Sequence, residues 1–297
     1  MELTQLRYVL AIADTGNFTR AAESVFVSQP SLSQQVAKLE DELGHKLFHR
    51  LGRRAVPTDA GLLFIERAQR IIFEVENVGR EIRDDPNIDR TISIGAIPTV
   101  APYILPSLIQ RCRGQLPNLR INTEEAFRSE LRRSVLSGRL DMAIIALPEN
   151  DPRLAAETMF NEPLVLAVGR QHRLASKRRF TMGDLAEQTF IMLGESSTLT
   201  QQIQSFCGAH NFQPRIGHTC AQVEMLKELV ALGLGVAILP RLAQNPDDRH
   251  RLVYRQLSTK NPTREIAVIR HLQRYQTTGA VQFLDLLRNT FRGLETV

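Results

Sequence analysis

Residues 27–33 have the sequence Val27-Ser28-Gln29-Pro30-Ser31-Leu32-Ser33, and this stretch decides how the N-terminal part of the chain folds. A serine side chain can accept hydrogen bonds from the free N–H groups that open a helix, and proline suits a first turn because its missing N–H costs nothing there. Ser28 and Pro30 therefore predict a helix start. Apolar residues follow at helical spacing, at Leu32, Val36, Leu39 and Leu43. Gly44 then ends the predicted helix.

The preceding residues predict two shorter helices. Apolar residues recur at helical spacing over 6–13, Gly16 follows as a stop, and Asn17 is placed to cap a second helix over 18–25. Short helices joined by a tight turn, with polar residues opening the last one, indicate a helix-turn-helix. The polar side chains of that opening cannot all be in a core, and they suit hydrogen bonds to base edges and phosphates. The alternative is a small helical bundle with a solvated polar face.

The segment 45–57 favours DNA binding because it carries four Lys/Arg and no acid directly after this motif. Gly52 and the basic pair Arg53 and Arg54 favour a turn, and a short β-like stretch follows. We predict a hairpin wing whose tip places Arg53 or Arg54 against the DNA backbone or in a minor groove. A basic loop by itself is usually only solvated.

A long helix is predicted next, over 59–83, with Thr58 as its cap. Small and apolar residues recur every seven positions, at Gly61, Ala68, Val75 and Ile82, at Ile65, Ile72 and Gly79, and at Phe64, Ile71 and Val78. Such a helix needs a partner to cover it, either a second copy of the chain or a surface of its own chain. We favour a dimer helix because a polar break at 84–90, which we interpret as a hinge, follows it.

From residue 91 the chain predicts an α/β domain, because strands and helices alternate. The expected strands are 91–97, 119–125, 141–147, 164–169, 190–193, 217–220, 236–240 and 266–269, and the expected helices are 103–116, 129–137, 199–207, 223–232 and 278–291. Two lobes with crossing segments near 163 and 268 would leave a cleft between them. The predicted division is 1–58, 59–90 and 91–297, with lobe I over 91–162 and 268–297 and lobe II over 163–267.

Three loops follow predicted strands and offer hydroxyls, free N–H groups and one guanidinium. Ligands of open α/β sheets lie at the carboxyl ends of strands and at helix N-termini. The set suits a small anion or a polar acid. A Ser or Thr at a helix start is more often only a cap, so the evidence is that three such loops coincide. The candidate effector residues are Pro98, Thr99, Val100, Arg128, Ser197 and Thr198.

The charge and composition restrict the class of protein without identifying it. The net charge is +5, but residues 1–90 carry −2 and residues 91–297 carry +7, so the overall charge does not support DNA binding. A basic run at 170–180 with five Lys/Arg is interpreted as a solvated loop, with anion attraction or contact with another subunit or polymerase as the alternative. No apolar run could span a bilayer, and the N-terminus does not resemble a secretory signal. Three cysteines without paired spacing exclude a disulfide scaffold and a zinc site. We expect a cytoplasmic protein with no metal and no cofactor.

Several segments resemble the LysR-type transcriptional regulator family. They are Phe18-Thr19-Arg20-Ala21-Ala22-Glu23, residues 27–33, Lys38-Leu39-Glu40-Asp41-Glu42-Leu43-Gly44, Leu47-Phe48-His49-Arg50 and Thr58-Asp59-Ala60-Gly61. The match is specific over 1–62 and looser over the rest, where it includes 233–240. The resemblance implies a winged helix-turn-helix, a dimerising linker helix, a two-lobed effector domain of the periplasmic-binding-protein type, and a homotetramer. The implied partners are double-stranded promoter DNA, a small-molecule effector, further copies of the chain and RNA polymerase, and no membrane.

The resemblance also implies roles for individual residues of this chain. Gln29, Pro30 and Ser33 match groove-facing positions, and Thr99, Arg128 and Ser197–Thr198 match segments that line the effector cleft. Many members have Ser or Thr where Arg128 stands here, and this departure favours an anionic effector. The full set of candidate DNA contacts is Ser28, Gln29, Pro30, Ser31, Ser33, Gln34, Lys38, Arg50, Arg53 and Arg54.

Within the family, residues 97–106 and Phe206-Cys207 are most similar to the peroxide-sensing, OxyR-like branch. Thr198 stands where that branch carries its peroxide-reactive cysteine, and Cys207 stands at the partner position. A hydroxyl, with its far higher pKa, cannot replace a thiolate, so a disulfide switch of that type is not supported. Cys207 is expected to be a buried apolar thiol.

The predicted function is therefore a DNA-binding regulator controlled by a small, anionic ligand between two lobes. One alternative is an OxyR-like oxidative-stress regulator with a different or lost redox switch. A solute-binding protein is disfavoured by the helix-turn-helix and the missing signal. An enzyme is disfavoured because the sequence has no metalloprotease, hydrolase, Walker or dinucleotide motif.

Overall fold

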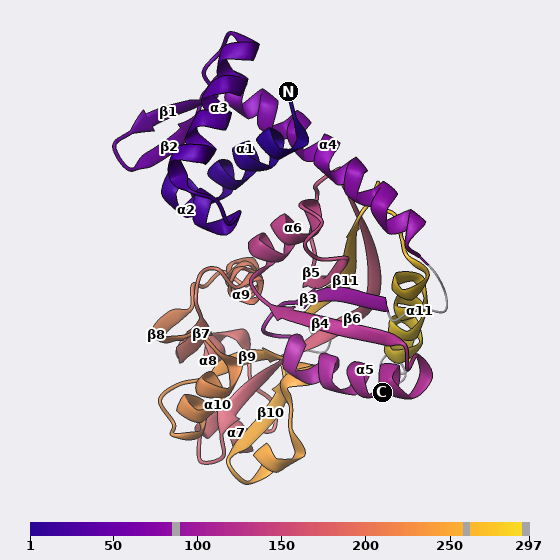
Figure 1. Ribbon diagram of the computed structural model, residues 1–297. Coiled ribbons are helices and arrows are strands. Elements are labelled where there is room, and N and C mark those ends of the chain that lie inside the picture. The colour runs from indigo at the N-terminus through magenta and orange to yellow at the C-terminus, as the bar shows by residue number, and fades with distance from the viewer. Residues whose placement is uncertain (85–89, 258–261, 293–297) are drawn as a thin grey trace. The chain divides into compact units, whose positions relative to one another are not determined.

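The computed structural model describes residues 1–84, 90–257 and 262–292. The chain forms two compact units, Met1–Asp85 and Pro86–Val297 (Figure 1). Their division falls within the predicted hinge at 84–90, of which residues 85–89 lie outside the described residues. In the part of the chain that is described, no helix combines the length and the apolarity needed to cross a bilayer.

The N-terminal unit is a winged helix-turn-helix followed by a long helix, as predicted. Its elements are α1 (Leu3–Thr15), α2 (Phe18–Ser24), α3 (Gln29–Leu43), the antiparallel strands β1 (Phe48–Leu51) and β2 (Arg54–Pro57), and α4 (Asp59–Ile82). Asn17 accepts hydrogen bonds from the Thr19 and Arg20 N–H groups at 2.8 and 3.1 Å, and Ser28 accepts one from Ser31. Local capping therefore sets both helix starts.

Helix α4 has two apolar faces. On one face Ala68 and Ile72 pack with Leu6 of α1, so part of the predicted seam is buried against its own chain. A second face, formed by Ile71, Val75, Val78 and Ile82 in the C-terminal half of the helix, is exposed, and Leu62 and Leu63 are exposed on other sides near its start. The helix thus docks on α1 and still presents an uncovered apolar surface.

The first lobe of the second unit is a mixed sheet between helices. It contains β3 (Arg90–Ala96), α5 (Ala101–Gln115), β4 (Leu119–Glu125), α6 (Arg128–Leu136), β5 (Met142–Ala146) and α11 (Thr278–Arg292). Strand β3 pairs in parallel with β4 and β5. Because the β3–β4 and β4–β5 crossovers run in opposite directions across the sheet, α6 covers one face and α5 the other, beside α11 (Figure 1).

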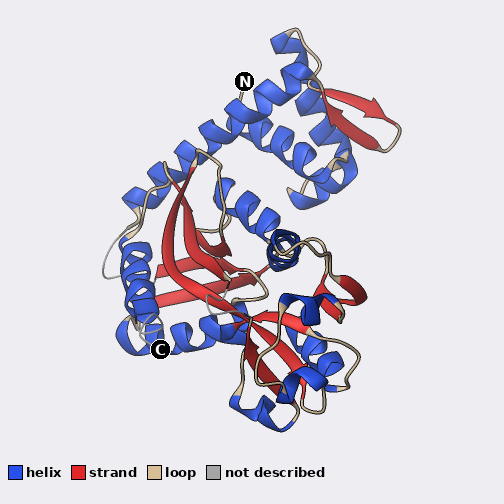
Figure 2. Ribbon diagram, turned by 180° about the vertical axis from the view of Figure 1, so that it is seen from behind, coloured by secondary structure: helices blue, strands red, loops and turns tan. Residues whose placement is uncertain are grey.

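The second lobe is built on shorter elements around its own apolar core. They are α7 (Arg173–Ser176), α8 (Met182–Ala186), β7 (Thr189–Leu193), α9 (Thr198–Ala209), β8 (Arg215–Cys220), α10 (Val223–Ala231), β9 (Ala237–Pro240), the 3-10 turns Arg241–Ala243 and Pro246–His250, and β10 (Leu252–Gln256). The long strand β6 (Leu154–Gly169) runs from the first lobe into the second, and the long strand β11 (Thr263–His271) pairs with the first part of β6 (Figure 2).

In the structure, β6 pairs with β11 up to Pro163 and with β9 from Leu164, so it passes from one lobe to the other near residue 163. Strand β6 is continuous from Leu154, whereas the sequence predicted a strand only from Leu164, because Asn161, Glu162 and Pro163 interrupt the apolar pattern. The boundary predicted between 267 and 268 falls inside β11, which pairs with β5 and β6 in the first lobe. Residues 263–267 therefore pair within the first lobe's sheet, whereas the prediction assigned them to the second lobe, and residues 258–261 lie outside the described residues.

Candidate functional site

Helix α3 presents a polar face to solvent and an apolar face to the core. Pro30, Ser31, Gln34 and Lys38 are exposed, whereas Gln29 and Ser33 are half-buried. The hydroxyl of Ser28 accepts a hydrogen bond from the Ser31 N–H at 3.3 Å and so serves as the helix cap. The predicted polar face is thus available over two helical turns.

Arg50 of the wing reaches back to α3. Its guanidinium donates to the Ser33 hydroxyl at 2.9 Å and lies 4.3 Å from the centre of the Phe18 ring. A cation over an aromatic ring is held in place by the ring's negative face. Arg50 therefore orients Ser33 as well as offering charge at the surface.

The wing is anchored to the turn between α1 and α2. The Asn17 side chain donates to the Arg53 carbonyl at 2.8 Å, and the Ala55 N–H donates to the Gly16 carbonyl at 2.8 Å. Gly52 has a φ of +61°, which allows the tight turn at the tip. Arg53 and Arg54 are exposed at this fixed tip, as the sequence predicts.

Phe26 is a feature of this unit that the sequence analysis missed. It lies two residues before the Ser28 cap, has a φ of +57°, and is 94% exposed. A positive φ is uncommon for a residue with a side chain. The signal was present in the sequence, because an aromatic residue stood in the predicted turn.

In the second unit, most of the loop after β3 is buried, so little of it is accessible to a ligand. Val100 is fully buried in the first-lobe core, and its N–H donates to the Ile97 carbonyl at 2.9 Å, so neither its side chain nor its N–H is open to a ligand here. Thr99 is 3% exposed, and its hydroxyl accepts a hydrogen bond from Arg264 Nη1 at 2.7 Å. Only Pro98 of the three predicted residues is partly exposed.

Arg264 and Glu162 form a buried ion pair where β11 meets β6. Arg264 Nη2 lies 2.7 Å from Glu162 Oε2, and the two side chains are 0% and 2% exposed. Glu162 Oε1 also accepts from the Leu242 N–H at 2.9 Å, and Arg264 donates to the Thr99 carbonyl at 3.1 Å. The pair and its hydrogen bonds connect the β3–α5 loop, the strands β6 and β11, and the turn after β9.

The end of β5 meets helices from both lobes. Arg128, the first residue of α6, donates to the Pro148 carbonyl at 2.5 Å. Gln202 of α9 donates through Nε2 to the neighbouring Leu147 carbonyl at 3.4 Å. The Gln202 oxygen Oε1 is buried and has no hydrogen-bond partner in the described chain. A buried acceptor without a partner is costly, and it marks a place for a donor.

The residues Ser197 and Thr198 open α9 and are largely buried, at 5% and 8% exposure. Thr198 and Gln202 are four residues apart and so share one face of α9. Among the described residues, no hydrogen bond joins Thr99, Arg128, Ser197 and Thr198 to one another. The structure therefore brings Arg128 and α9 to the same segment, 147–148, and commits Thr99 to Arg264.

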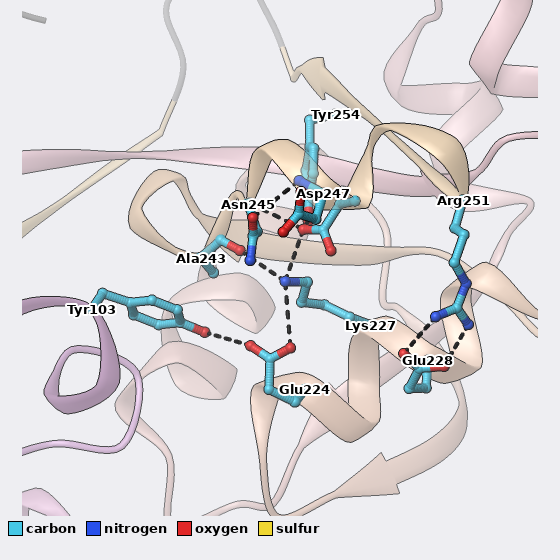
Figure 3. A network of polar contacts seen from close by, with 10 residues as sticks. Tyr103, Glu224, Lys227, Glu228, Ala243, Asn245, Asp247, Arg251 and Tyr254 are labelled. Atoms are coloured by element: carbon cyan, nitrogen blue, oxygen red, sulfur yellow. Dashed lines mark hydrogen bonds and ion pairs between the residues drawn. The ribbon is translucent and has the colours of Figure 1, made fainter.

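A second polar network links the lobes (Figure 3). The Tyr103 hydroxyl of α5 donates to Glu224 of α10 at 3.2 Å, and burial, with Glu224 nearby, raises the Tyr103 pKa well above its usual value. Lys227 is buried and lies 3.5 Å from Glu224 and 2.8 Å from Asp248. The Tyr254 hydroxyl also donates to Asp248, at 2.5 Å. The network joins α5 of one lobe to α10 and the Pro246–His250 turn of the other.

All three cysteines are free and buried. Burial raises the pKa of the Cys207 thiol to about 11, and it raises the pKa values of Cys112 and Cys220 as well. The thiolate is the reactive form of cysteine, so none of these thiols is activated at neutral pH. Cys207 is the buried apolar thiol that the sequence predicts.

Two family models cover nearly the whole chain. Residues 3–62 match the bacterial regulatory helix-turn-helix protein of the lysR family, and residues 87–292 match the LysR substrate binding domain. The chain belongs to the LysR family. It is a DNA-binding transcriptional regulator with an effector-binding domain.

Relatives of this LysR-family regulator include peroxide regulators. It is 35% identical to the hydrogen peroxide-inducible genes activator of Pectobacterium carotovorum subsp. carotovorum, over 91% of this chain and 90% of the relative. It is 34% identical to the DNA-binding transcriptional dual regulator OxyR of Escherichia coli (strain K12), over 91% and 89%. A structure of full-length OxyR from Pseudomonas aeruginosa is similar with a TM-score of 0.73 and 28% identity, covering 98% of this chain and 95% of that one. The predicted likeness to the OxyR-like branch is confirmed.

Sequence reasoning missed Arg264, Glu162 and Gln202 of this regulator. Glu162 and Arg264 lie just before the predicted strands 164–169 and 266–269, and only the pairing of β6 with β11 shows that the two residues are neighbours. Gln202 could have been found from its spacing, because it lies one helical turn after Thr198.

Proposed function

We propose that this regulator places α3 in the major groove of its DNA site and the wing on the flanking backbone or minor groove. The observation that carries the proposal is that Lys38, Arg53 and Arg54 are exposed and make no ion pair among the described residues. Unpaired cations on a fixed surface can replace the counterions of phosphates. Of the predicted contacts, Ser28 acts mainly as a cap, and Arg50 mainly positions Ser33.

The wing is tested by replacing Arg53 and Arg54 together with alanine. DNA affinity should fall, and the slope of log affinity against log salt should flatten by about two, because each lost phosphate contact removes about 0.9 from it. Fluorescence anisotropy across a salt series measures both quantities. The variant Arg111→Ala with Arg113→Ala removes the same charge from α5 and should keep the wild-type slope. An unchanged slope in the wing variant would exclude the wing as a phosphate contact.

We further propose that two copies pair through the exposed apolar face of α4 and that dimers assemble into a homotetramer. An apolar stripe that continues to Ile82 supports the pairing, because isolated apolar faces of this length are usually covered. DNA sites of such a dimer consist of two related half-sites. RNA polymerase is the proposed downstream partner, in the cytoplasm, and the chain acts without catalysis and without a cofactor.

The effector is proposed to be a small anion that also carries a hydrogen-bond donor. Arg128 supplies a guanidinium beside Pro148, and the unpaired oxygen of Gln202, whose amide nitrogen donates to the adjacent Leu147 carbonyl, supplies an acceptor. Pro98, Ser197 and Thr198 complete the proposed site. Ligand control follows if the ligand binds one arrangement of the lobes more tightly than another.

This proposal predicts that Arg128→Gln loses the response to small organic acids while it still binds DNA. A thermal-shift screen of hydroxy and keto acids against the full-length protein measures ligand binding, and anisotropy measures DNA affinity. One lost charge-assisted contact should weaken a hit by roughly tenfold or more. Hits that bind Arg128→Gln as tightly as wild type would remove Arg128 from the site.

The alternative of a redox-controlled regulator is tested by measuring DNA affinity with and without hydrogen peroxide. The similarity to peroxide regulators favours it, whereas the raised pKa of Cys207 opposes it. If hydrogen peroxide alone changes DNA affinity, and Cys207→Ala abolishes that change, the protein is a peroxide sensor and the ligand proposal is wrong.

A further inference from the structure

The second lobe contains an open pocket that the proposed function does not use. It has a volume of about 620 Å³ and lies where the end of β6, the start of α7, the end of α10 and the start of β10 meet. Its polar lining consists of Arg170, Gln171, His172, Arg173, His250 and Arg251, and no acidic side chain lines it. Burial, with Arg173 nearby, lowers the pKa of His172, so the positive charge of the pocket comes from its three guanidinium groups. It shares no residue with Arg128, Ser197, Thr198 or Gln202.

Arg170 holds a charge without a counter-charge at this pocket. Its Nη1 donates to the Arg249 carbonyl at 2.6 Å, which fixes the side chain, and it makes no ion pair among the described residues. A fixed guanidinium with further free N–H groups is suited to an anion, because the fork matches the oxygens of a phosphate or carboxylate.

The other two guanidinium groups are paired, but only at the surface. Arg173 lies 2.7 Å from Glu187, and Arg251 donates to Glu228 at 2.8 Å. The four side chains are 52–68% exposed. An exposed pair such as Arg173–Glu187 contributes little free energy, so the Arg173 guanidinium can turn to a ligand at small cost. Arg251 holds Glu228 through both Nη1 and Nη2, so it would have to keep that pair while a free edge of its guanidinium faces the pocket.

The end of α10 adds little negative field to the pocket. The Gly233 N–H, at a φ of +79°, donates to the Val230 carbonyl at 3.0 Å, and the Leu234 N–H donates to the Leu229 carbonyl at 3.2 Å. These bonds satisfy carbonyls that would otherwise face an anion. Gly169 allows the close approach of β6, since a Cβ there would lie 2.8 Å from the Val230 oxygen.

We infer that this pocket binds a small phosphorylated anion with one or two phosphate groups. Three guanidinium groups from two sides of the pocket match a pyrophosphate better than a single carboxylate, and the volume falls in the range of small-molecule sites. The site is separate from the effector site and does not depend on it.

The test is isothermal titration calorimetry of the full-length protein with inorganic pyrophosphate at low ionic strength. Wild type should bind one equivalent saturably, and Arg170→Gln should weaken the affinity by roughly tenfold, the loss expected for one charge-assisted contact. Arg179→Gln is the matched control, because it removes the same charge from the same basic segment outside the pocket, and it should bind within twofold of wild type. Equal losses in the two variants, or no saturable binding to wild type, would overturn the proposal.

A second variant distinguishes loss of a charge contact from damage to the fold. Glu187→Gln frees Arg173 and removes a nearby negative charge, so it should tighten pyrophosphate binding, whereas damage to the fold would weaken it. Adenosine diphosphate and adenosine form two further arms. If adenosine diphosphate binds and adenosine does not, the pocket recognises the phosphates. If adenosine binds and adenosine diphosphate does not, the inference is contradicted. Because Arg128→Gln should bind pyrophosphate like wild type, failure of this inference is distinct from failure of the effector proposal.

Discussion

A Gly61→Ala variant should lose about 3 kcal/mol of folding free energy and most of its DNA affinity. A Cβ at Gly61 would lie 2.0 Å from the Leu47 carbonyl oxygen, and this neighbour is backbone that cannot rotate away. The same oxygen accepts from the Thr58 N–H at 2.9 Å, and Thr58 caps α4 through the Gly61 N–H. Opening this contact therefore separates α4 from the segment that leads into the wing.

The matched control is Gly79→Ala in the same helix. The nearest atom to a Cβ there, at 3.1 Å, is the flexible end of the Arg83 side chain. Alanine is the better helix former by about 1 kcal/mol, so this variant should be as stable as wild type or more so. Urea unfolding followed by circular dichroism, with DNA binding by anisotropy, compares the two. Equal stability of the two variants would show that the contact with Leu47 does not require glycine at position 61.

The N-terminal unit could be predicted closely because its signals are local. Asn17, Ser28 and Thr58 each cap the helix that follows within three residues, and Gly16 and Gly44 end helices with positive φ. The apolar stripes of α1 and α3 then leave one way to close the core. The exception is Phe26, whose exposure depends on how the turn is oriented and not on spacing.

The second unit was less predictable because its decisive contacts are long-range. The strand β6 continues through Glu162 and Pro163, and Glu162 is tolerated there only because Arg264, about a hundred residues later, is its neighbour. Without that pairing, a charged residue in an apolar run indicates a break, and the predicted strand begins too late. Because the pairing of β11 with β6 could not be foreseen either, the predicted lobe boundary between 267 and 268 falls inside β11.

The candidate effector site shows the same limit. The predicted strand ends drew attention to Arg128 and Thr198, since helix starts follow strands in an α/β sheet. The sequence gives no means of knowing that Val100 turns into the core, or that Thr99 is held by Arg264. It also does not show that the carbonyls of residues 147 and 148 receive Gln202 and Arg128 from different lobes.

Glu162→Ala should be the most destabilising single change in the second unit, at about 3–5 kcal/mol. It leaves the guanidinium of Arg264, which is fully buried, without its counter-charge, and it frees the Leu242 N–H. Urea unfolding of the full-length protein should show an earlier transition for the second unit. Glu228→Ala, which breaks an exposed pair with Arg251, should unfold close to wild type.

The double variant Glu162→Leu with Arg264→Met separates charge from shape. Apolar residues of similar volume often replace a buried ion pair at little cost, so the double variant should recover most of the stability that Glu162→Ala loses. It also removes the bonds from Arg264 to Thr99, which hold the β3–α5 loop. We therefore expect restored folding with a weakened response to any effector hit. If the double variant unfolds as early as Glu162→Ala, the hydrogen bonds to Thr99 and Leu242 hold this lobe junction together, and the uncompensated charge of Arg264 is not the cause of the loss.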